Sequence, residues 1–388
     1  METADDRALR DILLERIAAR GSMTFADYMA ACLYEPGLGY YTSPGRKVGA
    51  EGDFYTSSNV HRVFGRLIAR EIVSMWHALG APADFQIVEA GAASGRLSAD
   101  IMDAVAQLEP ALYGTVTCRL IEAEPSLAEI QRTMLKDHLP RLAWSTPEEL
   151  AEGALQITGC LVTNELVDAL PVHLVEMTAD GLREVMVTAE GDEFREQLAP
   201  LSTGEIATYL QRLGVTLTVG QRAEIRLAAD RWLRGVARSL QRGFVLTIDY
   251  GYQAGELYGP MRQNGTLLCY YRHQVEENPY IRVGQQDITS HVDFTSLVKC
   301  GEEAGLTALW YGEQYRFLMA AGMMEELLAL EARPVSEEER LKDRLALKKL
   351  MLPDGGMGDT FKVLVQGKGV ERPELLCLGD WTARFQGV

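Results

Sequence analysis

Two stretches of this sequence combine small and acidic residues in a pattern that suits nucleoside binding. The segment QIVEAGAASGRLSADIM (86–102) runs through apolar residues into Glu89, continues with five small residues from 91 to 95, and then takes on helical spacing. Small residues after a strand let a ligand lie directly against the backbone. Glu122 ends the next apolar run, in CRLIEAE (118–124). A carboxylate there can accept hydrogen bonds from both hydroxyls of a ribose.

Three kinds of ligand compete for the small-residue turn, and the residues in it distinguish them. A P-loop has Gly-Lys-Ser or Gly-Lys-Thr after the turn, whereas here Gly95 is followed by Arg96. The dinucleotide pattern G-x-G-x-x-G, counted from Gly91, needs glycine where this chain has Ala93 and Arg96. S-adenosylmethionine has an adenosine and no diphosphate, so it is the ligand that this turn fits best. The alternative is a tight turn that binds no ligand. The predicted cofactor-binding residues here are Glu89, Gly91, Ala93, Gly95 and Glu122.

Strands and helices alternate from residue 85 onward, and these elements must position the turn. Helical spacing separates short apolar runs that predict strands at 85–91, 118–124, 141–145, 157–165 and 243–252. Such alternation predicts right-handed βαβ units in an α/β fold with a mostly parallel, doubly wound sheet.

Two further regions interrupt that rhythm. An alternating polar and apolar pattern with turns near 180–181 and 191–192 predicts an inserted antiparallel meander. The Gly- and Tyr-rich stretch 253–294 predicts a long functional loop. The predicted organisation is an N-terminal helical extension with a lid loop, a core in two pieces and an inserted α+β subdomain, at 1–84, 85–171 with 242–388, and 172–241.

Composition narrows the function classes. The chain of 388 residues has 38 Lys and Arg against 55 Asp and Glu, a formal charge of −17. This charge disfavours nucleic acid and would suit a cationic partner such as a Lys- or Arg-bearing peptide, although it also serves solubility. The six cysteines lack CxxC spacing, which predicts a reducing compartment and no metal site. The acidic N-terminus has no targeting pattern and no apolar run reaches membrane-spanning length, so we expect a cytoplasmic protein without membrane insertion.

Seven stretches, taken in order, resemble the MidA family of S-adenosylmethionine-dependent methyltransferases: FADYMAACLYEPGLGYY, GDFYTSS, VEAGAASGRLSADIM, VTNELVDALPVH, IDYGY, DITSHVDF and MGDTFKVL. The resemblance covers nearly the whole chain. It implies a class I methyltransferase core (a Rossmann-like sheet) with an N-terminal helical extension and an insertion. It also implies protein arginine methylation, the activity of the characterised mitochondrial members, which act in respiratory complex I assembly. Most of the family has GPGxG where this chain has GAASG, and the missing presequence predicts a bacterial member.

The stretch TNELVDALP supplies the predicted catalytic carboxylates. Asn164 and Glu165 end a predicted strand beside the cofactor turn, and Asp168 follows three residues later. If the substrate is arginine, two carboxylates can hold its planar guanidinium and direct one nitrogen at the methyl group. We therefore predict that Glu165 and Asp168 face the substrate and that Asn164 contacts the cofactor. The alternatives are a helix cap at Asp168 and a solvated strand end at Glu165.

Two loops supply further candidates. DITSHVDF places His291 between two acids, where it could accept the proton released after transfer or could brace a loop. Asp293 in the same stretch is predicted mainly to cap the following helix. By resemblance, the GDFYTSS loop closes over the cofactor or substrate. Asp53 supplies the anion that the methionine amino group needs, and Thr56 is a further predicted cofactor-binding residue.

The leading hypothesis is that the chain is a protein methyltransferase that N-methylates an exposed arginine of a protein substrate. Alternatives are a methyltransferase for a small molecule or another side chain, and a non-catalytic assembly factor that retains the cofactor fold. An NAD-dependent dehydrogenase is disfavoured by the missing glycines.

Overall fold

The computed structural model describes residues 4–43, 60–272, 274–352 and 357–380. The chain divides into two compact units. The small-sheet unit comprises Met1–Phe54, Val167–Trp232 and Gly251–Leu297, and the large-sheet unit comprises Tyr55–Leu166, Leu233–Tyr250 and Val298–Val388. The domain ranges expected from the sequence stay a prediction.

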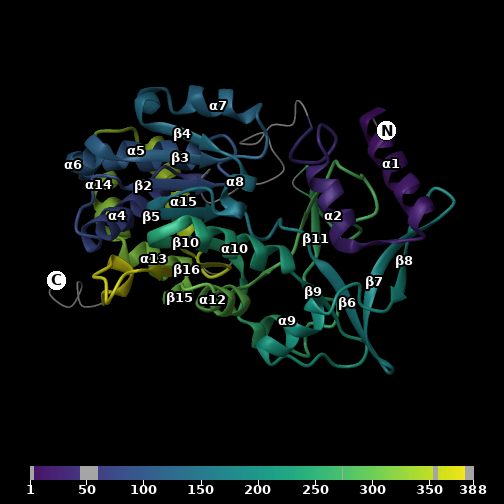
Figure 1. Ribbon diagram of the computed structural model, residues 1–388. Coiled ribbons are helices and arrows are strands. Elements are labelled where there is room, and N and C mark those ends of the chain that lie inside the picture. Colours follow the sequence, from purple (N-terminus) through teal and green to yellow (C-terminus); the bar gives the residue numbers. More distant parts are fainter. Residues whose placement is uncertain (1–3, 44–59, 273, 353–356, 381–388) are drawn as a thin grey trace. The chain divides into compact units, whose positions relative to one another are not determined.

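A mostly parallel sheet forms the centre of the large-sheet unit (Figure 1). Its strands are β2 (Gln86–Ala90), β3 (Thr117–Ile121), β4 (Leu142–Ser145), β5 (Ile157–Asn164), β10 (Leu240–Tyr252), β15 (Thr307–Glu313) and β16 (Phe361–Lys368). They lie in the order β15-β16-β10-β5-β2-β3-β4. All neighbouring pairs from β10 to β4 are parallel, whereas β16 runs antiparallel to both β10 and β15. The predicted strands and the doubly wound α/β class are confirmed.

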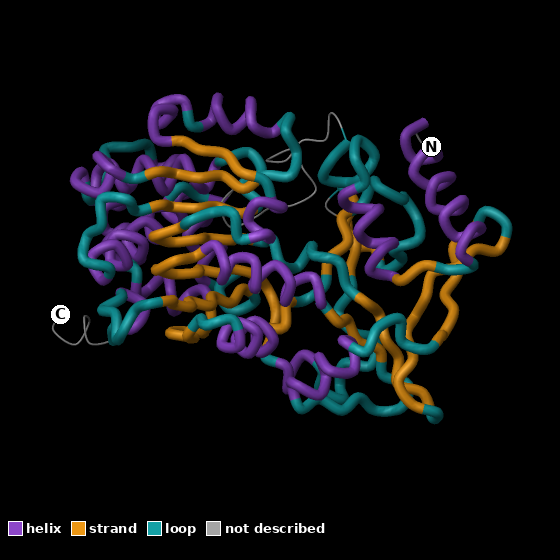
Figure 2. Tube along the Cα trace, viewed as in Figure 1, coloured by secondary structure: helices purple, strands orange, loops and turns teal. Residues whose placement is uncertain are grey.

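Helices flank this sheet, as Figures 1 and 2 show. They are α4 (Val63–Ala78), α5 (Arg96–Leu108), α6 (Pro110–Thr115), α7 (Leu127–Met134), α8 (Pro147–Glu152), α13 (Gln314–Ala320), α14 (Met323–Glu331), α15 (Glu337–Met351) and the 3₁₀ turns η1 (Lys136–Arg141) and η2 (Leu376–Leu378). Ile87, Val162 and Leu246 share one core with α4 and α5. The alternate residues Val88 and Leu161 are also buried. Burial on both faces explains why these strands are continuous apolar runs.

The strand order reverses direction between β2 and β5. From β2 the chain proceeds outward through β3 to β4, and it then returns to place β5 and β10 on the other side of β2. In open α/β sheets, ligands bind outside the carboxyl ends of the strands at such a reversal. The carboxyl ends of β2 and β5 are adjacent, because Ala90 pairs with Thr163.

The small-sheet unit combines the N-terminal helices with the predicted meander. Its elements are α1 (Ala4–Arg20), β1 (Met23–Thr24), α2 (Phe25–Tyr34), β6 (His173–Thr178), β7 (Gly181–Glu190), β8 (Glu193–Ala199), α9 (Glu205–Leu213), β9 (Arg222–Ile225), α11 (Ala254–Leu257) and β14 (Val292–Asp293). The strands follow the order β1-β7-β6-β9, with β8 paired to β7. Side chains of α1 and α2 share a core with β6, β7 and β8. The meander turns lie where predicted, at Gly181 and Gly191, both with positive φ.

The predicted long loop at 253–294 is more ordered than expected. It contains a small sheet in which β11 (Leu268–Tyr271) pairs with both β12 (Gln274–Glu276) and β13 (Asp287–Thr289). These strands are too short to show a periodic apolar pattern, so they were not predicted from the sequence. Helices α10 (Leu227–Ser239) and α12 (Phe294–Glu303) each contain residues of both units. Among the described residues, no helix combines the length and apolarity needed to cross a bilayer.

Candidate cofactor-binding and active site

The turn between β2 and α5 is built from left-handed backbone conformations. Gly91, Ala93 and Gly95 have φ of 75°, 49° and 78°. A Cβ atom on Gly91 would lie 2.9 Å from the Leu166 side chain, and one on Gly95 would lie 3.1 Å from Leu135. The small residues are therefore required by backbone conformation and by close packing on either side. The result is a turn with bare peptide groups at the amino end of α5.

Glu89 caps α5 from inside the sheet. Its buried carboxylate accepts hydrogen bonds from the backbone N–H of Ser98, at 3.0 Å, and from the Ser98 hydroxyl. Burial raises the pKa of Glu89 to about 7, although the bonds from Ser98 act in the opposite direction. These contacts support a role in holding the turn, and the predicted contact of Glu89 with the cofactor stays a prediction.

Glu122 lies just beyond β3, beside the turn. Its carboxylate accepts hydrogen bonds from the backbone N–H groups of Ala123 (2.9 Å) and Glu124 (3.2 Å). Burial raises the pKa of Glu122, and hydrogen bonding with the backbone of Ala93 and these neighbours lowers it. A carboxylate held in this way beside the turn is suited to the hydroxyls of a ribose.

Gln131, a buried residue of α7 that joins these parts, is not among the residues predicted from the sequence. Its side-chain amide donates to the carbonyl of Ala93 at 2.9 Å and to Glu122 at 3.2 Å. Its oxygen accepts from the indole N–H of Trp144 at 2.9 Å. A polar residue with no solvent exposure needs such partners. A glutamine within the apolar pattern of SLAEIQRTML was the available signal.

Asn164 and Glu165 lie at the carboxyl end of β5, next to the turn. Glu165 has φ of 54° and donates its backbone N–H to Ile248 of β10 at 2.9 Å. The amide of Asn164 donates to the Glu165 carboxylate at 3.1 Å. The structure therefore gathers Gly91, Glu122, Asn164 and Glu165 at one edge of the sheet.

The remaining candidates belong to the small-sheet unit or lie outside the described residues. Asp168 belongs to the small-sheet unit, where it is buried in a turn and starts no helix. Asp293 caps α12 by accepting the N–H of Ser296 at 3.0 Å, so that prediction is confirmed. Asp53 and Thr56 lie outside the described residues.

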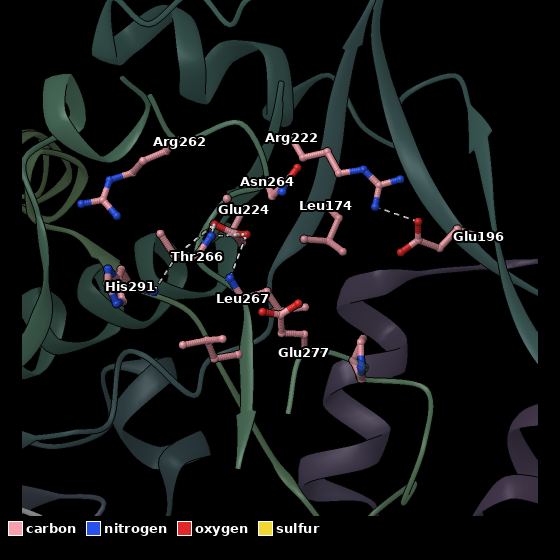
Figure 3. Close-up of a pocket in the computed structure, with 13 residues that line it drawn as sticks. Leu174, Glu196, Arg222, Glu224, Arg262, Asn264, Thr266, Leu267, Glu277 and His291 are labelled. Atoms are coloured by element: carbon pink, nitrogen blue, oxygen red, sulfur yellow. Dashed lines mark hydrogen bonds and ion pairs between the residues drawn. The ribbon is translucent and has the colours of Figure 1, made fainter. Parts of the chain in front are cut away.

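His291 borders a cavity of about 520 Å³ in the small-sheet unit (Figure 3). Its backbone N–H donates to the Thr266 hydroxyl at 3.0 Å, and its ring lies 5.2 Å from that of Tyr252. Burial, reinforced by Arg262 and Arg226, lowers its pKa to about 4. His291 is therefore neutral at physiological pH, and its catalytic role stays a prediction.

The fold and the turn together define the class of protein. A doubly wound sheet with one reversed strand, small residues at the strand-order reversal and an acid beyond the next strand form the class I S-adenosylmethionine-dependent methyltransferase fold. The residues present fit this cofactor: the bare turn at Gly91 and Gly95 suits close approach of the ligand, and Glu122 suits its ribose.

Comparisons with known proteins agree with this class. The model of a family of S-adenosyl-L-methionine-dependent methyltransferases matches residues 67–312. The protein arginine methyltransferase NDUFAF7 of Mus musculus, a mitochondrial protein, is 28% identical over 363 residues, covering 85% of this chain and 78% of the relative. The Drosophila melanogaster homolog is 27% identical over 385 residues, covering 92% and 84%.

A solved structure extends the similarity to the whole fold. The crystal structure of a COG1565 superfamily member from Burkholderia thailandensis, bound to S-adenosyl-homocysteine, has a TM-score of 0.85 and 32% identity, covering 97% of this chain and 95% of that one. The chain belongs to the MidA family of S-adenosylmethionine-dependent methyltransferases. The predicted family, enzyme class and cofactor are confirmed.

Proposed function

We propose that this protein N-methylates an arginine side chain of a cytoplasmic protein. The position of Glu165 supports this proposal most directly. Glu165 has a left-handed backbone conformation at the end of β5, beside the cofactor turn. A guanidinium is always charged at neutral pH, and a carboxylate binds it through two parallel hydrogen bonds. The relatives named protein arginine methyltransferases give independent support.

In methyl transfer, the protein mainly has to align the methyl group of the cofactor with the attacking nitrogen of the substrate. When bound, the cofactor supplies an electrophilic methyl group on a sulfonium. Glu165 would hold one edge of the guanidinium and leave another nitrogen directed at that methyl group, and Asp168 is proposed to assist. The attacking nitrogen gains the methyl group and loses one proton. This proton passes to water, and His291 is proposed as the group that relays it.

A cytoplasmic location and a basic protein substrate are part of the same proposal. All six cysteines are buried free thiols, as expected in the reducing cytoplasm. The formal charge of −17 suits a basic substrate segment.

Transfer of labelled methyl groups to protein tests the proposal. Soluble protein from a strain lacking the gene is incubated with the enzyme and S-adenosylmethionine labelled in its methyl group. We expect acid-precipitable label that hydrolysis releases as methylated arginine. Label on another side chain, or only on small molecules, would contradict the proposal, and the absence of transfer would favour an assembly factor.

Glu165→Gln tests the assigned role. We expect turnover to fall about 100-fold, the scale of a misplaced substrate, while S-adenosyl-homocysteine still binds. Glu129→Gln is the matched control, because Glu129 is an exposed carboxylate on α7. Equal loss of turnover and cofactor affinity in Glu165→Gln would place Glu165 in a different role.

A further inference from the structure

Strand β9 and the residue after it present a row of charged side chains. In the sequence Arg-Ala-Glu-Ile-Arg (222–226), the alternate residues Ala223 and Ile225 are buried in an apolar core of the small-sheet unit. Because side chains alternate along a strand, Arg222, Glu224 and Arg226 share the other face.

Each member of this row holds a different segment. Arg222 donates to Glu176 at 2.9 Å and forms a 2.8 Å ion pair with Glu196 (Figure 3). Glu224 accepts the backbone N–H groups of Thr266 (3.0 Å) and Leu267 (3.2 Å). Arg222 therefore ties β9 to strands β6 and β8, and Glu224 ties it to the segment before β11.

Arg226 is the buried end of the row, with 4% of its surface exposed. Its Nη1 lies 2.6 Å from each of three carbonyl oxygens, those of Val167, Asp168 and Leu170. Its Nη2 donates to the carbonyl of Ser290 at 2.8 Å and to the Ser290 hydroxyl. The Arg226 guanidinium thus binds both the turn 167–170 and Ser290, the residue after β13. A planar fork can serve both segments at once, whereas a lysine offers a single nitrogen.

We propose that Arg226 is a positioning residue of the methyl-acceptor site, which fixes the backbone of 167–170 and thereby the Asp168 carboxylate. This inference rests on the proposed function, in which Asp168 faces the substrate guanidinium. The turn is held further by the Ser290 N–H, which donates to the Asp168 carbonyl at 3.3 Å. Arg226 acts through backbone carbonyls, so it sets where Asp168 lies without touching the substrate.

Kinetics of Arg226→Lys and Arg226→Met test the proposal, with Arg222→Met as the control from the same row. The acceptor is the soluble protein fraction that the wild-type enzyme methylates. We expect kcat/KM for this acceptor to fall about 10- to 100-fold in Arg226→Lys, the scale of a substrate group displaced by about 1 Å. S-adenosyl-homocysteine affinity should remain unchanged, because none of the groups that Arg226 contacts belongs to the cofactor turn. Arg226→Lys is the decisive variant if Arg226→Met does not fold.

A double-mutant cycle separates positioning from general stability. If Arg226 acts through Asp168, Asp168→Asn combined with Arg226→Lys is no slower than Asp168→Asn alone. Losses that simply multiply, or full activity in Arg226→Lys, would overturn the inference. Absence of arginine methylation by the wild-type enzyme would instead reject the proposed function, and it is visible before any variant is made.

Hydrogen exchange gives a readout that needs no acceptor. We expect faster exchange of the amides in 167–170 and at Ser290 in Arg226→Lys, and wild-type exchange there in Arg222→Met. Unchanged exchange in Arg226→Lys would show that Arg226 does not hold the turn.

Discussion

Glu165 and Ala93 adopt left-handed backbone conformations that residues with side chains rarely use, at a cost of about 1–2 kcal/mol each. Ala81, Arg272 and Arg282 also have positive φ, so this conformation alone does not mark a site. What distinguishes the first two is their place, at the ends of β5 and β2 where the strand order reverses. Strain that persists at such a place is consistent with a functional requirement.

At the scale of the residue, Glu122→Gln should weaken cofactor binding. A hydrogen bond to a charged group contributes about 1.5–3 kcal/mol, so the affinity for S-adenosylmethionine should fall about 10- to 100-fold. Titration calorimetry measures this, with Glu129→Gln as the control carboxylate. Equal affinities for Glu122→Gln and the wild type would remove Glu122 from the ribose site.

Glu89 should make stability depend on pH. Its pKa is raised from 4.5 to about 7, so the folded protein binds more protons than the unfolded chain between these values. The associated stability is complete below the unfolded pKa and is lost as pH rises through the folded pKa. Glu89→Gln keeps a neutral hydrogen-bond acceptor and cannot titrate. Its melting temperature relative to wild type should therefore increase from about pH 5 to about pH 8, and parallel curves would refute this account.

At the scale of the element, the β2–α5 turn depends on both its neighbours. Leu166, which follows β5, packs against Gly91, and Gln131 of α7 holds the carbonyl of Ala93. The turn is thus shaped by two elements that the chain reaches only later.

Gly91→Ala should therefore disturb the cofactor site more than a comparable change elsewhere. Gly80 has a similar φ of 82° but open space around it, whereas a Cβ on Gly91 (φ 75°) meets Leu166. Both alanine variants should lose about 1 kcal/mol of stability from backbone strain. Only Gly91→Ala should weaken S-adenosyl-homocysteine binding, which calorimetry measures; equal binding by both variants would dismiss the turn as the site.

At the scale of the whole molecule, the formal charge of −17 should influence how a basic substrate approaches. Raising the salt from about 20 to about 300 mM shortens the Debye length from roughly 20 Å to about 6 Å. The kcat/KM for the protein acceptor should fall several-fold, because screening weakens long-range attraction. Binding of S-adenosyl-homocysteine should change little, since it carries no net charge. A salt-independent kcat/KM would argue against electrostatic attraction of the acceptor.

The sequence by itself determined the five parallel strands of the large sheet, the turn at Gly91 and the acid at Glu122. These features are local, because buried parallel strands are continuous apolar runs and the turn needs small residues at particular positions. Order along the chain, together with the family resemblance, was enough to predict the fold class and the cofactor.

Only the tertiary structure decided which distant residues complete the sites. Gln131 meets Ala93 across 38 residues, and Arg226 meets Asp168 across 58. The reversed direction of β16 and the pairing of the short strands β11 to β13 likewise depend on partners far away in the chain. Such contacts arise from strand register and packing, which place side chains together irrespective of their spacing in the sequence.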